Sequence, residues 1–135
     1  MKRKLLGPLA VLGLLAVALP AWAHHSPSAE FEVSKFVEIK GVVTKVDWIN
    51  PHVFVYLDVK DPATGKVTQW ALQSLPTRMF HQSGLTKEML LADGRQEVTA
   101  KIWPAKDGSN YGFLARLTLP DGHYFALLPD NLTAK

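Results

Sequence analysis

The sequence predicts a mainly β protein: a small OB-like barrel of five to six strands with one short helix between strands three and four. Three observations carry this prediction. Apolar and polar residues alternate along most of the chain, as they do in half-buried strands. A short segment that begins with Pro and ends with Gly follows the third strand. The first strand is long and contains a glycine, which suits a strand that bends to join both sides of a barrel. A small sandwich would give a similar order of elements.

The first 23 residues have the order of parts found in a secretory signal peptide. Three basic residues precede an apolar run over residues 5–19, and Ala21-Trp22-Ala23 fits the A-x-A cleavage site. The alternative is an uncleaved membrane anchor, but the run is shorter than the roughly 20 residues that a spanning helix needs. We therefore expect cleavage after Ala23, export to the periplasm and no stable membrane span after cleavage.

The composition narrows the classes of function. Three of the 15 Lys and Arg residues precede Ala23, so the remaining basic residues balance the 12 Asp and Glu residues. Nucleic-acid-binding domains usually show a basic excess or stripe, so we expect no nucleic-acid partner. The chain has no cysteine, which excludes a disulfide framework and a thiolate zinc site.

Four segments are expected along the chain: the signal peptide over 1–23, an extended polar arm over 24–35, the barrel over 36–128 and a polar tail over 129–135. The expected strands cover residues 36–48, 52–59, 66–74, 96–103, 112–119 and 123–128. Their expected inward residues include Val53, Val55, Leu57, Val59, Trp70, Leu72, Val98, Ala100 and Ile102.

Two local signals refine this pattern. Gly41, alone within the first strand, predicts a bulge or a sharp bend. Pro76 opens the short helix and Gly84 closes it, and Thr86 is placed to cap a further turn through Leu91.

The histidines after the cleavage site suggest a metal centre. Cleavage makes His24 the first residue, and its free amine and imidazole can close one chelate ring around a metal. Nitrogen ligands in a tetragonal plane suit Cu(II) and, less well, Ni(II). His25 or His52 would add nitrogen, since His52 starts a strand at a barrel rim within reach of the arm. The alternatives are a solvated arm and a strand-end histidine that bonds to the Asn50-Pro51 turn.

A second candidate surface lies on the second strand. Phe54 and Tyr56 share the face opposite the apolar one, where aromatic side chains of OB folds stack on ligands. The helix, the arm or a partner would otherwise cover them. His81 and His123 are expected at the surface. No triad, paired carboxylates or nucleophile elbow is visible, so no catalytic residue is assigned.

Taken together, several motifs resemble a family of small exported bacterial proteins of unknown function. Its members begin with His-His-Ser, as at His24, and carry a G-x-V-x-x-V-x-W-x-N-P-H strand, as over residues 41–52. The likeness continues through Trp70, Ser74-Leu75-Pro76, the Pro104–Gly108 loop and the Leu119–Gly122 hairpin. Here Gly84-Leu85 stands where members often have Gly-Trp. The resemblance implies a periplasmic OB-like barrel and no particular activity.

Three hypotheses of function follow. The first is an exported periplasmic barrel that binds a metal ion through His24, with copper as the expected metal. The second is a metal-free binding or scaffold module that uses Phe54 and Tyr56 for a small ligand, a glycan or a protein. The third, an oxidative copper enzyme, is the weakest, because an N-terminal histidine chelate does not by itself specify a reaction.

Overall fold

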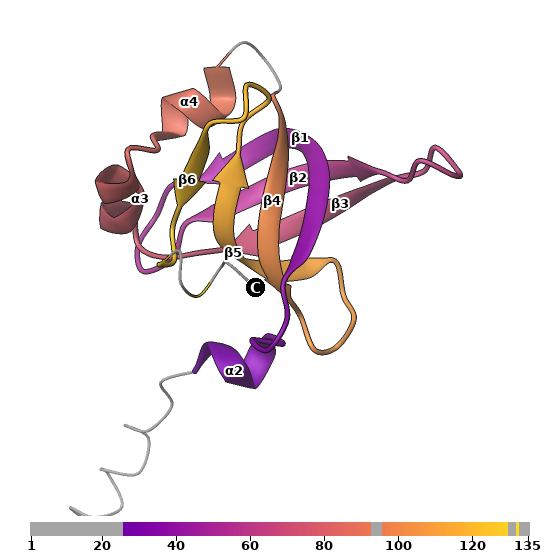
Figure 1. Ribbon diagram of the computed structural model, residues 1–135, viewed down its shortest axis with the longest axis horizontal. Coiled ribbons are helices and arrows are strands. Elements are labelled where there is room, and N and C mark those ends of the chain that lie inside the picture. The colour runs from indigo at the N-terminus through magenta and orange to yellow at the C-terminus, as the bar shows by residue number, and fades with distance from the viewer. Residues whose placement is uncertain (1–25, 93–95, 130–131, 133–135) are drawn as a thin grey trace, which may run out of the picture.

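The computed structural model describes residues 26–92, 96–129 and 132, and the statements below concern these residues. The predicted signal peptide, His24 and His25 lie outside them. The strands are β1 (Val37–Asp47), β2 (Phe54–Lys60), β3 (Val67–Gln73), β4 (Glu97–Pro104), β5 (Tyr111–Thr118) and β6 (Tyr124–Ala126). The helices are α2 (Pro27–Glu30), α3 (Thr77–Ser83) and α4 (Lys87–Leu91) (Figure 1). No described helix is long and apolar enough to span a bilayer.

Five of these strands close into the predicted barrel. The strands lie in the order β3-β2-β1-β4-β5, and a parallel pairing between β3 and β5 closes the circuit. The short strand β6 extends the sheet beyond β5. Along β1, residues 37–42 pair with β4 and residues 42–47 pair with β2. The long first strand therefore joins both sides of the barrel, as its length predicts (Figure 1).

Gly41 lies where β1 changes partners. A Cβ atom at this position would lie 2.7 Å from the main-chain oxygen of Asp58 on β2, closer than a carbon atom can approach without displacing the backbone. The predicted irregularity is therefore a close approach of two strands at Gly41. The register shift itself lies further along, between Val43 and Lys45.

The inward faces agree with the alternating pattern, with two partial exceptions, Val59 and Trp70, which are only half-buried. Val53, Val55 and Leu57 are fully buried, and so are the predicted inward residues of β4, Val98, Ala100 and Ile102. Leu72 is also buried, but Trp70 on the same face is only half-buried and packs at the margin of the core. Both Val59 and Trp70 belong to the β2–β3 hairpin, which extends beyond the barrel (Figure 1).

Two short helices, rather than the single predicted one, connect β3 to β4. Gly84 ends α3 with a φ of +85°, which confirms the predicted C-terminal glycine. The Thr86 side chain accepts a hydrogen bond from the N–H of Met89 at 3.3 Å and so caps α4, which is the predicted further turn. Phe80, Leu85 and Leu90 are fully buried and close one end of the core. Leu85, which follows the helix-ending glycine, is thus part of this core.

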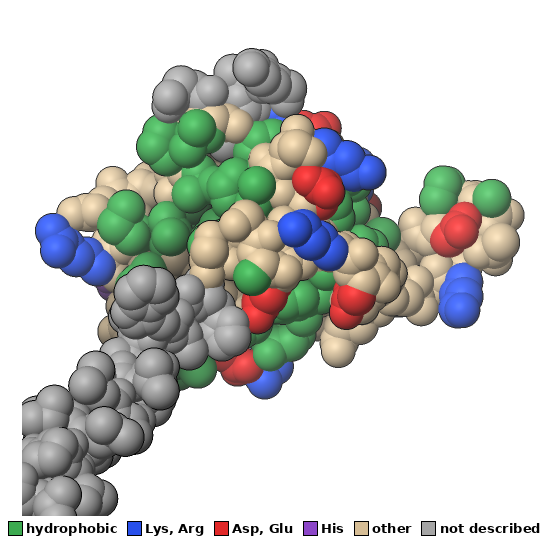
Figure 2. Space-filling model, turned by 90° about the horizontal axis from the view of Figure 1, so that it is seen from below, with side chains coloured by type: hydrophobic (Ala, Val, Ile, Leu, Met, Phe, Trp, Pro, Cys, Tyr) green, Lys and Arg blue, Asp and Glu red, His purple; other side chains and the backbone are tan. Residues whose placement is uncertain are grey.

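Figure 2 shows acidic and basic side chains interspersed on the face seen from below. On β1 and its neighbours, Lys40 pairs with Glu97 at 2.8 Å and Lys45 pairs with Asp47 at 2.9 Å. The mixing of signs on this face agrees with the balanced charge of the chain after Ala23.

Candidate functional site

The arm that precedes β1 packs against one end of the barrel. The prediction of an extended arm is wrong over Pro27–Glu30, which forms the single turn α2. Pro27 stands at the first helical position, where its fixed φ favours a helix start. In Figure 1, α2 lies beside the loop that connects β4 to β5.

Phe31 anchors this arm. Its side chain is only 1% exposed, although the residues around it are polar or exposed. Its ring lies 5.2 Å from that of Tyr111 and 5.7 Å from that of Phe113, both on β5, and its backbone forms a bridge to Ala105. Rings at these separations attract one another beyond the area that they bury.

Main-chain contacts hold the arm on both sides of Phe31. The N–H of Glu32 donates to the carbonyl of Pro104, and the N–H of Lys106 donates to the carbonyl of Glu30, each at 2.9 Å. The ammonium group of Lys106 also donates to the carbonyl of Ser28 at 2.6 Å. The loop after β4 therefore fixes the path of the chain from Ser28 to Glu32.

His52 lies just before β2, at the same end of the barrel, and is half-buried. Its Nδ1 is 2.9 Å from the carbonyl oxygen of Ser74. A carbonyl only accepts, so Nδ1 carries the proton and a neutral ring keeps its lone pair on Nε2. The position of Ser74 is fixed in turn, because its buried hydroxyl donates to the carbonyl of Leu114 at 2.9 Å. The expected bond of His52 to the Asn50-Pro51 turn is replaced by this bond to the chain after β3.

A cavity of about 230 Å³ lies between the arm and the barrel. Its lining residues are Ser26, Pro27, Glu30, Phe31, His52, Gln73 and Phe113. The first described residue of the arm and His52 therefore face the same space. The volume would hold several water molecules at about 30 Å³ each, or a metal ion with its ligands.

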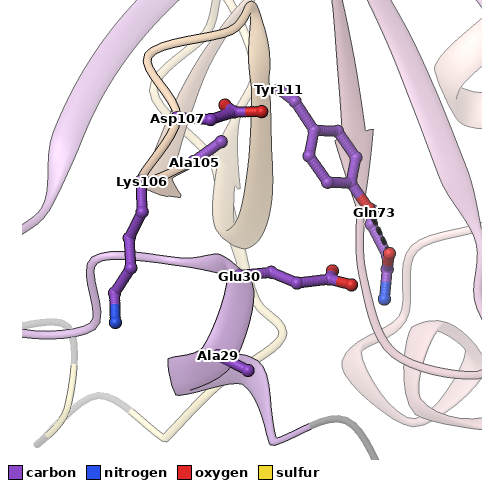
Figure 3. Close-up of a pocket in the computed structure, with 7 residues that line it drawn as sticks. All are labelled: Ala29, Glu30, Gln73, Ala105, Lys106, Asp107 and Tyr111. Atoms are coloured by element: carbon purple, nitrogen blue, oxygen red, sulfur yellow. Dashed lines mark hydrogen bonds between the residues drawn. The ribbon is translucent and has the colours of Figure 1, made fainter.

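A second cavity of about 470 Å³ adjoins the first, since Glu30 and Gln73 line both. Figure 3 shows the carboxylate of Glu30 directed toward Gln73. The hydroxyl of Tyr111 donates to Oε1 of Gln73, which orients the amide. Burial raises the pKa of the Tyr111 phenol, and the negative charge of Glu30 adds to the rise, so the phenol remains a donor at neutral pH.

Of the three predicted metal ligands, the structure describes His52. Within residues 26–92, 96–129 and 132, no three His, Asp or Glu side chains group in a way that would hold a metal ion. His24 and His25 lie outside these residues. His81 and His123 are exposed, as predicted, and their rings contact Trp48 and Phe125 respectively.

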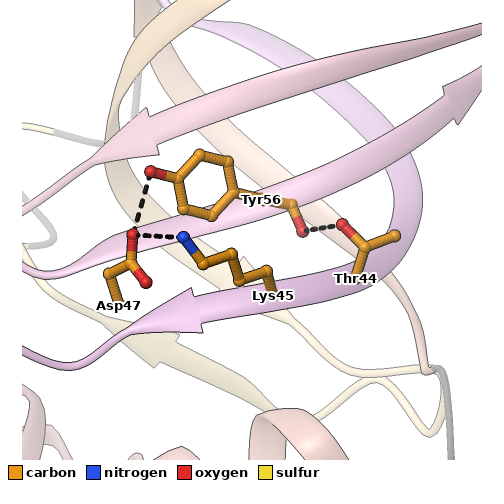
Figure 4. Close-up of polar contacts among 4 residues, drawn as sticks. All are labelled: Thr44, Lys45, Asp47 and Tyr56. Atoms are coloured by element: carbon orange, nitrogen blue, oxygen red, sulfur yellow. Dashed lines mark hydrogen bonds and ion pairs between the residues drawn. The ribbon is translucent and has the colours of Figure 1, made fainter.

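The second candidate surface has its own polar network. The rings of Phe54 and Tyr56 lie nearly parallel, with centroids 6.4 Å apart, and both side chains are half-buried. The Tyr56 hydroxyl donates to Asp47 at 3.1 Å, while Lys45 bonds to the same carboxylate and lies 4.9 Å from the Tyr56 ring centroid (Figure 4). The hydrogen bond from Lys45 lowers the pKa of Asp47, and burial raises that of Tyr56. These bonds give Tyr56 a structural role within the sheet.

Sequence reasoning missed Glu30, Gln73 and Tyr111. Gln73 and Tyr111 come together through the parallel pairing of β3 with β5, which no local sequence pattern predicts. Phe31 could have signalled the docked arm, because a large apolar residue stood between two glutamates in an otherwise polar segment.

Comparison with known proteins places the chain in a family. A model described as "Family of unknown function (DUF6152)" matches residues 11–115. The chain belongs to this family. The matched range contains every residue that lines the two cavities and ends within β5. No curated protein and no solved structure matches the chain significantly.

Proposed function

We propose that this member of the family is an exported periplasmic barrel that binds Cu(II). Cleavage after Ala23 frees the amine of His24, and this amine and the His24 ring chelate the metal. His25 or His52 adds a further nitrogen. Such a nitrogen-rich set suits the tetragonal geometry of Cu(II).

The observation that carries the proposal is the cavity shared by Ser26 and His52. The amine of His24 is separated from Ser26 by two residues, which span at most roughly 7 Å. The chain that would carry the chelate thus starts at the wall of the cavity that contains His52. Docking of the arm through Phe31 holds this starting point against the barrel.

The hydrogen bond of His52 supports the same role. Histidine ligands usually donate their second ring N–H to a carbonyl or a carboxylate, which fixes the ring and its tautomer. His52 makes such a bond to Ser74 through Nδ1, and Nε2 keeps the lone pair that a metal needs. A strand-end histidine with a purely structural role would make the same bond, so only a binding measurement separates the two roles.

The export step has its own test. The intact mass of the protein recovered from the periplasm should correspond to a chain that begins at His24. A product that retains Trp22 would refute both the export hypothesis and the N-terminal chelate.

The decisive experiment is a copper titration in a buffer that does not chelate. We compare four proteins: the processed protein, a form with one additional alanine before His24, His52→Ala and the control His123→Ala. The control removes an exposed histidine between β5 and β6. The additional alanine moves the amine away from the chelate and leaves every side chain in place. We expect it to weaken binding at least about 100-fold and His52→Ala at least about tenfold, where each tenfold is 1.4 kcal/mol.

Protons compete with the metal for these nitrogens, so affinity should fall as the pH drops below about 8 and again below about 6.5, the ordinary pKa values of an α-amine and an imidazole. Equal affinities of the extended and processed forms would exclude the N-terminal chelate. An unchanged affinity in His52→Ala would leave His25 as the added ligand.

The alternative is a metal-free binding module. The near-parallel rings of Phe54 and Tyr56 on the outer surface of β2 favour it. Replacing Phe54 by Ala would then abolish binding of a saccharide or protein partner and leave copper affinity unchanged. Copper binding by the processed protein, with no partner binding that depends on Phe54, supports the metal site.

A further inference from the structure

We propose that the larger of the two cavities binds an organic cation, that is, a ligand with an alkylammonium or guanidinium group. The side chains that carry this inference are Glu30, Asp107 and Tyr111, which all line the cavity. Its volume of about 470 Å³ lies within the roughly 300–1,000 Å³ that is usual for small-molecule sites. The inference goes beyond the proposed function, because it requires neither copper nor any residue before Ser26.

Segments that are far apart in the sequence form the wall of this cavity. Glu30 ends α2, Tyr111 begins β5 and Asp107 lies in the loop between β4 and β5. The N–H of Lys106 donates to the carbonyl of Glu30 at 2.9 Å and so ties the arm to this loop. Tyr111 is held in turn by the parallel pairing of β5 with β3. The protein backbone therefore shapes the cavity before any ligand binds.

Two carboxylates of the wall are open to a cationic partner. Within the described part of the chain, no hydrogen bond or ion pair involves the carboxylate of Glu30. Asp107 accepts the hydroxyl of Ser109 at 2.6 Å and its N–H at 2.9 Å through the same oxygen, Oδ1, so Oδ2 remains open to the cavity. These two bonds lower the pKa of Asp107, and its carboxylate is therefore ionised at neutral pH.

The basic residue of the wall, Lys106, does not form an ion pair with these carboxylates. Its ammonium donates to the carbonyl of Ser28 at 2.6 Å, and Figure 3 shows its side chain running away from Tyr111 and Gln73. Burial raises the pKa of the Tyr111 phenol, and the negative charge of Glu30 raises it further. The same negative charge that disfavours the tyrosinate favours a bound cation.

The chemistry of the wall favours an organic cation over a bare metal ion. The face of an aromatic ring attracts a cation that lies within about 6 Å of its centroid, and Phe31 holds the Tyr111 ring in place at a centroid separation of 5.2 Å. Ammonium and guanidinium N–H groups also donate to carboxylate oxygens in short, charge-assisted hydrogen bonds. Among the described residues, no three metal-ligating side chains group together. A ligand that combines positive charge with N–H donors therefore matches this wall better than a bare ion or an anion does.

The test is a titration of the processed protein without copper, followed through the backbone amide chemical shifts in nuclear magnetic resonance. The ligand is agmatine, which carries a guanidinium and an ammonium group, and butylurea is its neutral control. We expect Glu30→Gln and Asp107→Asn each to weaken agmatine binding about three- to fivefold, toward the upper end of what exposed ion pairs contribute. The matched control Glu38→Gln removes an exposed carboxylate of β1 that does not line this cavity. It should change the affinity less than about 1.5-fold at 0.15 M salt, which screens distant charges.

A capped Gly-Arg-Gly peptide is titrated alongside agmatine to identify the source of the cation. Tighter binding of the peptide would assign the site to an arginine side chain of a partner protein, and tighter binding of agmatine would assign it to a free small cation. The inference fails if neither ligand binds saturably, if butylurea binds as tightly as agmatine, or if Glu38→Gln weakens binding as much as Glu30→Gln. Because no metal is present, these outcomes do not bear on the proposed copper site, and a failed copper titration does not bear on this inference.

Discussion

Replacing Phe31 by Ala tests whether the arm is part of the folded domain. Aromatic side chains bury about 150–250 Å² each, and at about 25 cal/mol per Å² the ring of Phe31 contributes roughly 4–6 kcal/mol. Phe31 is 1% exposed and meets two other rings. Measured Phe-to-Ala changes in cores cost about 3–5 kcal/mol, and we expect a loss in this range.

The assay is urea unfolding followed by tryptophan fluorescence, with the free energy extrapolated to water. The matched control is Val33→Ala, in the same arm, because Val33 is 39% exposed and should cost less than about 0.5 kcal/mol. Limited trypsin digestion gives a second readout, since a released arm can adapt to the protease at the exposed Lys35 more readily than a docked one. A loss below about 1 kcal/mol without faster cleavage would refute the anchoring role of Phe31.

Three further predictions follow from the barrel. Trp70→Ala should cost about 2 kcal/mol in urea unfolding, less than a fully buried aromatic because the indole is half-buried; a loss above about 4 kcal/mol would contradict its marginal position. Gly41→Ala should cost about 1–3 kcal/mol, because the added methyl meets the Asp58 carbonyl at 2.7 Å; equal thermal midpoints would refute this contact. Asp47→Asn should lower the raised pKa of Tyr56 toward its ordinary value of about 10, because the anionic acceptor of the Tyr56 hydroxyl is lost. Ultraviolet titration measures this pKa, with Tyr56→Phe as the reference. Because the pKa of Tyr56 is raised in the folded state, its neutral phenol stabilises the fold; this stabilisation is complete below about pH 10 and is lost as the pH rises through the raised pKa. A Tyr56 pKa that is unchanged in Asp47→Asn would contradict the hydrogen bond between the two residues.

Local sequence patterns predicted most of the barrel. Alternation placed Val55 and Ile102 in the core because one face of each strand is buried, and Pro76 and Gly84 marked the limits of α3 because their backbones suit helix ends. Gly41 predicted a bulge or bend in the first strand, but the register shift lies further along, after Val43, since an inserted residue changes the pairing without changing the composition of the strand.

The candidate site was predictable only in part. His52 stood out because of its residue type and its place at a strand start. Glu30, Gln73 and Tyr111 did not, since each is an ordinary surface residue until β3 pairs with β5 and the arm docks. Contacts of this kind depend on tertiary structure, and no repeating spacing in the sequence reports them.

The pairing that closes the barrel also dictates an order of assembly. Strands β1 to β3 are neighbours in sequence and can form their hairpins early, but Ala71 pairs with Tyr111, about 40 residues later. Closing a loop of that length costs about 3 kcal/mol of chain entropy before any contact compensates for it. Until β5 arrives, β3 carries an open edge that another chain can extend. A chain that stops short of Tyr111 should therefore aggregate through Val67–Gln73.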